Sequence, residues 1–189
     1  MRWSSVLGAG WGGSPTGGLI VDATLQRRQR YQATVAPRVR HLVATWPDAA
    51  TTAGFLERLS RDDISAVIRW SGSERLEQIS AIAGVFRDLG IDTVQDLRDR
   101  LTGGAEGAKE LRSALRKIRN VGPKTVDYIA ILAGDPTAAA VDVRVRRVLG
   151  RAGIAAGGYD EVRAVVHAAA SKRGWRLADL DAVIWQAGA

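Results

Sequence analysis

Residues 108–132 read AKELRSALRKIRNVGPKTVDYIAIL, and this stretch decides the fold. Leu111, Leu115 and Ile118 recur at three- and four-residue spacing, which is the period of one face of a helix. Pro123 suits the first turn of a following helix, where a backbone N–H is not needed. The stretch therefore predicts a helix, a tight turn and a second helix, over residues 108–118, 119–122 and 124–132.

The turn itself consists of Arg119, Asn120, Val121 and Gly122. Gly122 can adopt a positive φ without steric cost, and Asn120 is the next best residue for a left-handed position. A helix that begins after such a turn leaves backbone N–H groups unpaired at its N-terminus, where the helix dipole also favours negative charge. The sequence therefore predicts a phosphate-binding turn, with Lys124 and Thr125 at its edge.

The rest of the chain also reads as helices with short connections. The clearest is residues 73–89, which Ser73 opens and Gly90 ends. Ala36-Pro37 predicts a break between two helices, because the residue before a proline is pushed out of the helical region. These two helices are expected over residues 19–31 and 38–46. Others are expected over residues 55–59, 64–70, 93–101, 143–149, 159–171 and 177–185. No segment alternates long enough to form a strand, so the predicted fold class is all-α, with about ten helices.

Composition excludes several kinds of site. The chain has 189 residues, of which 46% are hydrophobic, enough for one large domain or two small ones. It has no cysteine, which excludes disulfides, thiolate zinc sites, cysteine-ligated iron–sulfur clusters and cysteine nucleophiles. Its two histidines, His41 and His167, are too few for a histidine-built metal site, so we expect no metal and no cofactor. Residues 1–18 lack a signal-peptide core and no apolar run spans a membrane, so we expect a soluble, cytoplasmic protein.

The positive charge is concentrated in two stretches. The net charge is +7, and residues 112–151 hold nine basic residues against three acidic ones. A second stretch holds Arg27, Arg28, Arg30, Arg38 and Arg40, with no acid between Asp22 and Asp48. The alternative, a solvated helix face, would usually mix both signs. The pattern therefore favours a polyanionic partner such as nucleic acid, with strongly salt-dependent binding.

Two motifs resemble a known family. Residues 118–124, IRNVGPK, resemble the helix–hairpin–helix element, whose usual form is Leu-Pro-Gly-Val-Gly-x-Lys. Residues 140–148, AVDVRVRRV, resemble the Val-Asp-Thr-His-Val-x-Arg-Val segment of the endonuclease III superfamily of DNA glycosylases. The eighteen residues from Lys124 to Asp142 match the family's spacing between its two catalytic groups. The resemblance covers roughly residues 19–187 and is strong over 108–153.

The resemblance implies a catalytic pair. Lys124 would attack the sugar C1′ and expel the base, and the resulting Schiff base would permit β-elimination of the 3′ phosphate. Asp142 would stabilise the positive charge that develops on the deoxyribose and assist proton transfers. Asp142 also fits a second interpretation, as the N-cap of the helix that begins near Val143. The two interpretations are compatible.

The resemblance also implies how DNA is held. The family flips its target base into a cleft, and a glutamine of an early helix fills the gap. Gln26 and Gln29 are both candidates, and the sequence does not choose between them. The expected DNA contacts are Arg28, Arg119, Asn120, Val121, Gly122, Thr125, Arg144 and Arg147. The sequence departs from the family pattern where Arg119 and Asn120 replace proline and glycine, and where Val143 and Arg144 replace Thr-His. The missing cysteines mean that the iron–sulfur cluster of many relatives is absent.

The sequence therefore predicts two helical lobes around a basic cleft. We expect a Gly/Trp-rich arm over residues 1–21 that packs with the C-terminal lobe, and a helical barrel over 22–134 with the helix–hairpin–helix at 108–134. The C-terminal lobe, residues 135–189, would carry the catalytic aspartate. The expected function is a monomeric DNA glycosylase with AP-lyase activity, acting on double-stranded DNA with a damaged base or abasic site. The alternatives are a non-catalytic DNA-binding protein and an AP lyase that removes no base.

Overall fold

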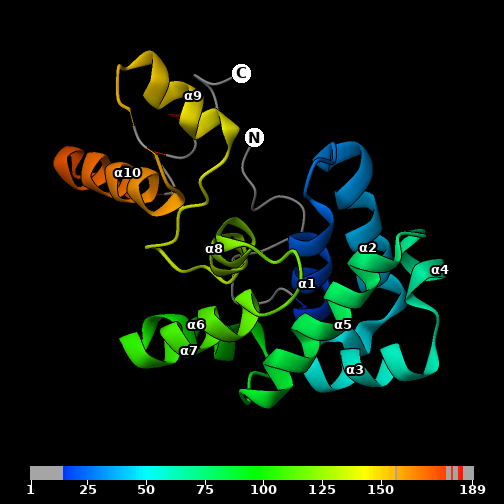
Figure 1. Ribbon diagram of the computed structural model, residues 1–189. Helices are drawn as coiled ribbons and strands as arrows, with labels where there is room; N and C mark the ends of the chain where they lie inside the picture. Colours follow the sequence, from blue (N-terminus) through cyan, green and yellow to red (C-terminus); the bar gives the residue numbers. More distant parts are fainter. Residues whose placement is uncertain (1–14, 156, 178–179, 181–182, 185–189) are drawn as a thin grey trace.

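The computed structural model describes residues 15–155, 157–177, 180 and 183–184, and this part of the chain is helical and contains no strand (Figure 1). The helices are α1 (Thr16–Leu25), α2 (Ala36–Thr45), α3 (Thr52–Arg61), α4 (Ile64–Ile68), α5 (Ser73–Asp88), α6 (Val94–Thr102), α7 (Ala105–Arg116), α8 (Pro123–Leu132), α9 (Val143–Arg151) and α10 (Tyr159–Arg173). A π-helical turn, η2 (Tyr31–Val35), precedes α2, and a 3-10 helix, η3 (Pro47–Ala50), follows it. The all-α prediction is confirmed.

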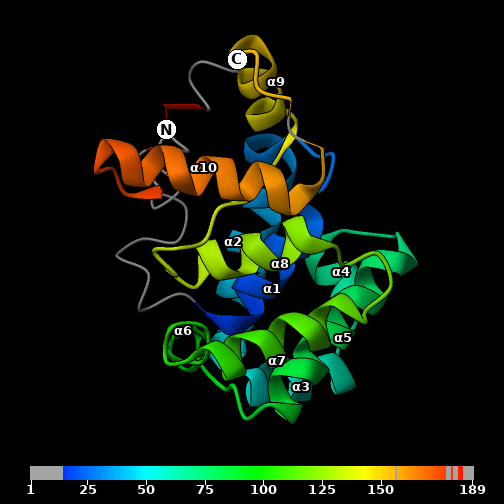
Figure 2. The same ribbon diagram turned by 60° about the vertical axis from the view of Figure 1, so that its left-hand side comes forward.

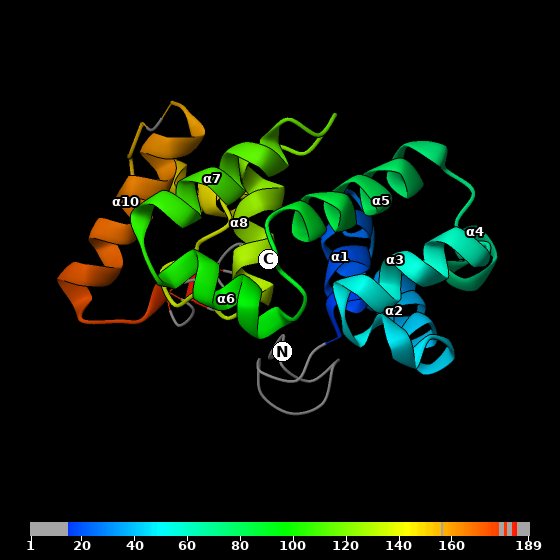
Figure 3. The ribbon, with the colours of Figure 1, turned by 90° about the horizontal axis from the view of Figure 1, so that it is seen from below.

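Helix α1 lies at the centre of the larger hydrophobic cluster, and all its residues are buried. It packs against α2, α5 and α8, as both Figure 1 and Figure 2 show. Gly17 permits the close approach of α3, since a Cβ there would lie 2.6 Å from the Phe55 ring. Seen from below, α1 to α5 gather on one side and α6, α7, α8 and α10 on the other (Figure 3).

A second, smaller hydrophobic cluster is formed by α9, α10 and the residues that flank them. The last buried residue of the larger cluster along the chain is Ala138, and the first buried residue of the smaller one is Ala139. In Figure 1, α9 and α10 stand apart from α1 to α5, and the segment after α8 leads to them. The chain thus builds two cores, joined by residues 133–142.

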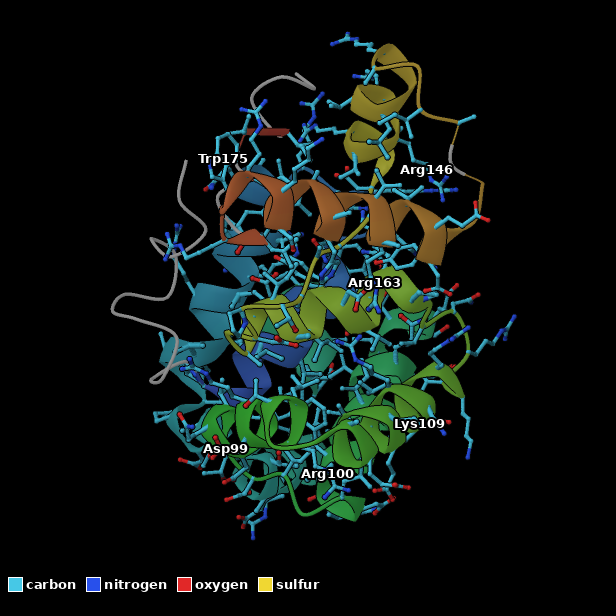
Figure 4. The ribbon with its side chains drawn as sticks, turned by 90° about the vertical axis from the view of Figure 1, so that its left-hand side faces the viewer. Asp99, Arg100, Lys109, Arg146, Arg163 and Trp175 are labelled. Carbon is cyan, nitrogen blue, oxygen red and sulfur yellow. The ribbon has the colours of Figure 1, made fainter. Side chains whose placement is uncertain are left out.

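A buried aspartate ties the two cores together. Asp127 of α8 has a side chain only 2% exposed, and Arg112 of α7 pairs with its Oδ1. From α10, Tyr159 donates to Asp127 Oδ2 at 2.8 Å, and the Arg163 guanidinium lies 3.4 Å from Oδ1. The hydroxyl of Tyr159 also accepts from the backbone N–H of Val141 at 3.2 Å. Figure 4 shows Arg163 between α10 and α8. These bonds hold the connecting segment against α8.

Two predicted boundaries near the N-terminus are wrong. Ala36-Pro37 does not break a helix, because Ala36 is helical (φ −56°, ψ −42°) and the proline lies in the first turn of α2, where its missing N–H is tolerated. The helix predicted over residues 19–31 ends at Leu25, and Arg28 turns the chain with a φ of 58°.

The expected N-terminal arm, residues 1–21, overlaps α1. Residues 16–21 belong to this buried helix and therefore to the larger core. The remainder of the arm up to residue 14 lies outside the described residues, as does most of the helix predicted over 177–185.

Candidate active site

A cavity of ≈ 610 Å³ opens where three segments of the chain meet. These segments are the turn after α1, one face of α8, and the stretch that leads from the end of α8 into α9, and Arg176, beyond α10, adds one more side chain. Six residues singled out from the sequence line the cavity: Gln26, Arg28, Gln29, Lys124, Asp142 and Arg144. The fold thus brings together residues that lie more than a hundred positions apart.

The charged side chains around the cavity are mainly basic. Its basic lining residues are Arg28, Arg30, Lys124, Arg144 and Arg176, and its acidic ones are Asp135 and Asp142. Asp135 is buried and accepts from the backbone N–H and the hydroxyl of Thr137, at 2.8 and 2.7 Å. A cavity with this excess of positive charge favours an anionic ligand.

Lys124 reaches the cavity from the second residue of α8. The helix begins there because Gly122, with extended backbone, ends the turn and Pro123 occupies the first helical position. Lys124 is exposed, so its amine is accessible to a ligand in the cavity. An accessible amine is a nucleophile whenever it is unprotonated.

Asp142 caps α9 and also lines the cavity. Its Oδ1 accepts from the backbone N–H groups of Arg144 and Val145, at 2.8 and 3.0 Å. The N-cap interpretation is therefore confirmed. These bonds fix the orientation of the carboxylate, which is half-buried beside the cavity. A carboxylate held in this way can stabilise positive charge that develops on a ligand.

The turn between α7 and α8 has the predicted position but a different conformation. Asn120, and not Gly122, takes the left-handed backbone, with a φ of 62°. Gly122 is extended, and a Cβ there would meet no atom within 4 Å, so the turn is open on this side. Val121 is buried in the larger cluster, and its N–H donates to the Ile118 carbonyl at 3.0 Å.

The remaining sequence-predicted residues do not line the cavity. Arg119 and Asn120 are exposed on the turn, and Thr125 lies in the first turn of α8. Arg147 is exposed on α9. One residue that sequence reasoning missed positions this turn: Gln78 of α5 is buried and donates from Nε2 to the Arg119 carbonyl at 2.9 Å.

The turn after α1 places Gln26, Arg28 and Gln29 on the cavity wall together. The N–H of Gln29 donates to the Gln26 carbonyl at 3.1 Å, which closes the turn. The left-handed conformation of Arg28 costs an arginine about 1–2 kcal/mol. Such strained residues cluster at functional sites.

Sequence reasoning also missed a buried acid next to the cavity. Asp22 of α1 is fully buried and accepts hydrogen bonds from two tyrosines that line the cavity, Tyr31 at Oδ2 (2.7 Å) and Tyr128 at Oδ1 (3.1 Å). Burial raises the pKa of Asp22 to about 6, and the two tyrosine hydroxyls oppose this rise. The signal in the sequence is a lone acid inside the apolar run LIVDATL, residues 19–25.

Within the described ranges, no group of three or more His, Cys, Asp or Glu side chains is arranged to hold a metal ion. The helices described there also include none that is long and apolar enough to cross a membrane.

The fold and the site define an all-helical protein in which a lysine, a helix-capping aspartate and several arginines line one cavity. A comparison with protein-family models matches residues 20–189 to DUF8548, described as a domain of unknown function, and the chain belongs to this family. Comparisons with curated proteins and with solved structures found no match.

Proposed function

We propose that this protein is a DNA glycosylase with an associated AP-lyase activity, which removes a damaged or modified base in base excision repair. The observation that carries the proposal is that Lys124 and Asp142, from separate helices, line one basic cavity. An amine nucleophile and a fixed carboxylate are the groups that substitution at a sugar carbon requires. The resemblance to the endonuclease III superfamily rests on these same two residues.

In the proposed reaction, the Lys124 amine attacks C1′ of the deoxyribose, and the electron pair of the C1′–N bond leaves with the base. Asp142 takes a proton from the Lys124 nitrogen that is now bonded to C1′ and gives it to the ring oxygen O4′. The C1′–O4′ bond then breaks, and O4′ leaves C1′ as an alcohol. The product is an iminium between Lys124 and C1′. Solvent then takes a proton from C2′, the electron pair of that C–H bond forms a C2′=C3′ double bond, and the C3′–O bond breaks so that the 3′ phosphate leaves with its electron pair. Water hydrolyses the remaining iminium and frees the Lys124 amine.

The proposal includes a helix–hairpin–helix element and two lobes with the DNA-binding cleft between them. The tight turn between α7 and α8, open at Gly122, supports phosphate binding by backbone N–H groups at the start of α8. The two separate hydrophobic clusters support the division into lobes. We propose that the protein acts as a monomer in the cytoplasm on double-stranded DNA with a damaged base or abasic site. Gln26 or Gln29 would fill the gap left by a flipped base.

The test is borohydride trapping on a duplex with a single abasic site. Borohydride reduces an iminium to a stable amine, so wild-type protein should become covalently bound to the DNA. Lys124→Ala should give no adduct. Lys117→Ala is the matched control, because Lys117 is also exposed but lies at the end of α7, outside the cavity lining.

Asp142→Asn separates the two roles of this residue, because asparagine caps a helix about as well as aspartate. The variant should fold and bind DNA but form the adduct at least tenfold more slowly. An adduct with Lys124→Ala equal to that of wild type would refute the assignment of the nucleophile. Tight binding of abasic DNA with no adduct from wild type would instead favour a glycosylase that uses only the aspartate, or a non-catalytic DNA-binding protein.

A further inference from the structure

Asp22 is a buried acid to which the proposed reaction of Lys124 and Asp142 assigns no role. Its helix is wholly buried, and its two hydrogen-bond partners come from different segments, Tyr31 from η2 and Tyr128 from α8. Both tyrosines line the cavity that holds Lys124, whereas Asp22 itself does not. Asp22 is thus connected to the cavity wall through the hydrogen bonds of these two tyrosines.

We propose that Asp22 supplies the proton that leaves with the excised base, and that the hydroxyl of Tyr31 relays it into the cavity. This inference rests on the proposed glycosylase function and adds to it the chemical class of the base. Tyr31 is the better relay of the two tyrosines, because its bond to Asp22 is shorter and its side chain is half-buried, whereas Tyr128 is 4% exposed.

The relay conserves protons and electrons. The electron pair of the breaking C1′–N bond moves onto the base, and a ring nitrogen of the base takes the hydroxyl proton of Tyr31. The relay starts from protonated Asp22, which donates at Oδ2 to the phenol oxygen of Tyr31. The phenol oxygen takes this proton as it gives up its own, and Asp22 becomes a carboxylate that accepts from Tyr31, which is the arrangement in the structure. Tyr31 is unchanged at the end, and solvent returns a proton to Asp22 before the next turnover.

Burial supports both parts of the relay. It raises the pKa of Asp22 to about 6, close to neutral pH, where a general acid is most effective. Burial also raises the pKa of Tyr31, and the nearby Asp22 raises it further, so the phenol keeps its proton and passes it on only in exchange.

Among the side chains packed around α1, the two tyrosines are the ones whose hydrogen bonds shift the pKa of Asp22. From α2, the charge of Arg40 lowers the pKa of Tyr31 and so opposes the other two effects. From α5, Arg75 donates to the Leu25 carbonyl at the end of α1. Helix α3 and η3 meet the other end of α1, at Gly17, through Phe55 and Ala49. From α8, Lys124 precedes Tyr128 by one turn and shares the cavity.

A proton relay selects the kind of base. A base that carries an unprotonated ring nitrogen can accept the proton and leave as a neutral molecule, and purines offer such lone pairs at N3 and N7. Uracil has no unprotonated ring nitrogen once it is attached to the sugar, and it leaves as an anion. The inferred substrate is therefore a base with an unprotonated ring nitrogen, and we infer a modified or mispaired purine, which offers more such nitrogens than cytosine with its single N3.

The experiment compares three kinds of duplex. The purine probes carry a single hypoxanthine, 8-oxoguanine or mispaired adenine, the pyrimidine probe a single uracil, and the lyase probe a preformed abasic site. Wild type should release one of the purines, and faster at pH 6 than at pH 8. Cleavage of the abasic probe should not depend on Asp22, because no base remains there to be protonated.

Asp22→Asn keeps an acceptor and a donor for the two tyrosines but has no proton to give. It should slow purine release by about 10²–10⁴-fold, the usual contribution of a general acid, and still be trapped on abasic DNA. Tyr31→Phe should behave in the same way. Tyr128→Phe removes a bond that lowers the pKa of Asp22, so it should move the pH dependence of purine release to higher pH.

Release of uracil but of no purine by wild type would overturn the inference, and so would release of no base at all. Purine release by Asp22→Asn at the wild-type rate and with the wild-type pH dependence would also overturn it. A failure of the proposed function would be seen separately, as the absence of a Lys124-dependent adduct on the abasic duplex. Circular dichroism of Asp22→Asn checks that a loss of release is not a loss of fold.

Discussion

Replacing Asp22 with asparagine should make the protein more stable at neutral and alkaline pH. The Asp22 carboxyl has an ordinary pKa of 3.8, and burial raises it to about 6 in the folded protein. A carboxyl whose pKa is raised by folding contributes stability that is fully present below its unfolded pKa and is lost as pH rises through its folded pKa. Above pH 6 the folded state therefore carries a buried charge that the unfolded state solvates better.

The size of the effect follows from the two pKa values. Their difference corresponds to about 3 kcal/mol at pH 8, at 1.36 kcal/mol for each unit of pKa. At pH 5 the destabilisation by Asp22 falls to about 1.5 kcal/mol, because the folded-state carboxyl is then mostly protonated. Asparagine has no charge to bury, so Asp22→Asn should exceed wild type in its free energy of unfolding by up to these amounts. At pH 8 the gain corresponds to a rise in Tm of roughly 6–12 °C for a chain of this size.

The assay is urea unfolding followed by circular dichroism, at pH 5, 6, 7 and 8. Asp88→Asn is the control, because Asp88 has a side chain 64% exposed and pairs only with its neighbour Arg87 in the described structure, so its replacement should change stability by less than about 0.5 kcal/mol. His167, whose pKa burial lowers, titrates with the opposite sign but is present in both proteins and cancels from the comparison. A difference between Asp22→Asn and wild type that is the same at all four pH values would refute the reasoning, since packing and not charge would then explain it.

Substitutions at three other positions test the fold and the charged surface. Asp127→Ala leaves two arginines and a tyrosine without their shared partner, so urea unfolding should show a loss of about 3–5 kcal/mol; a loss below 1 kcal/mol would mean that the two cores are joined in another way. Asn120→Val should lower the free energy of unfolding by about 1–2 kcal/mol, because a β-branched residue resists the left-handed backbone, while Asn120→Gly should be nearly neutral in the same urea-unfolding assay. Arg147→Ala should weaken binding to undamaged duplex and reduce the slope of log affinity against log salt by about 1; an unchanged slope would place Arg147 outside the phosphate contacts.

Local sequence signals predicted most of the helices because local backbone chemistry determines where they begin and end. Gly90 takes a φ of 68° just beyond α5, and Pro123 opens α8, as their residue types imply. The failures have the same origin. Pro37 is equally acceptable as a helix breaker and in a helix's first turn, and the residues around it do not distinguish the two. Arg28 gives no sequence signal for a left-handed turn, since arginine has no preference for that conformation.

The candidate site divides in the same way between local and long-range signals. Lys124 and Asp142 could be named because each sits in a short motif, and the cavity brings them together. Asp22 could not, because the tyrosine that binds its Oδ1, Tyr128, lies 106 residues away in the sequence. In the sequence, Asp127 is only one of three acids within the basic stretch 112–151, although its partners on α7 and α10 make it the link between the two cores.

The cost of Asp22 is itself an argument about function. Asparagine could satisfy the same two hydroxyls in the centre of a buried helix without the penalty of about 3 kcal/mol that the carboxylate carries above pH 6. A group that destabilises the fold next to a cavity, and whose pKa is moved toward neutrality, is what a general acid requires and what a purely structural hydrogen-bond acceptor does not. One substitution should therefore have two opposite effects. Asp22→Asn should raise stability and strongly slow purine release, and a variant that gained stability with no loss of release would show that the acid has only a structural role.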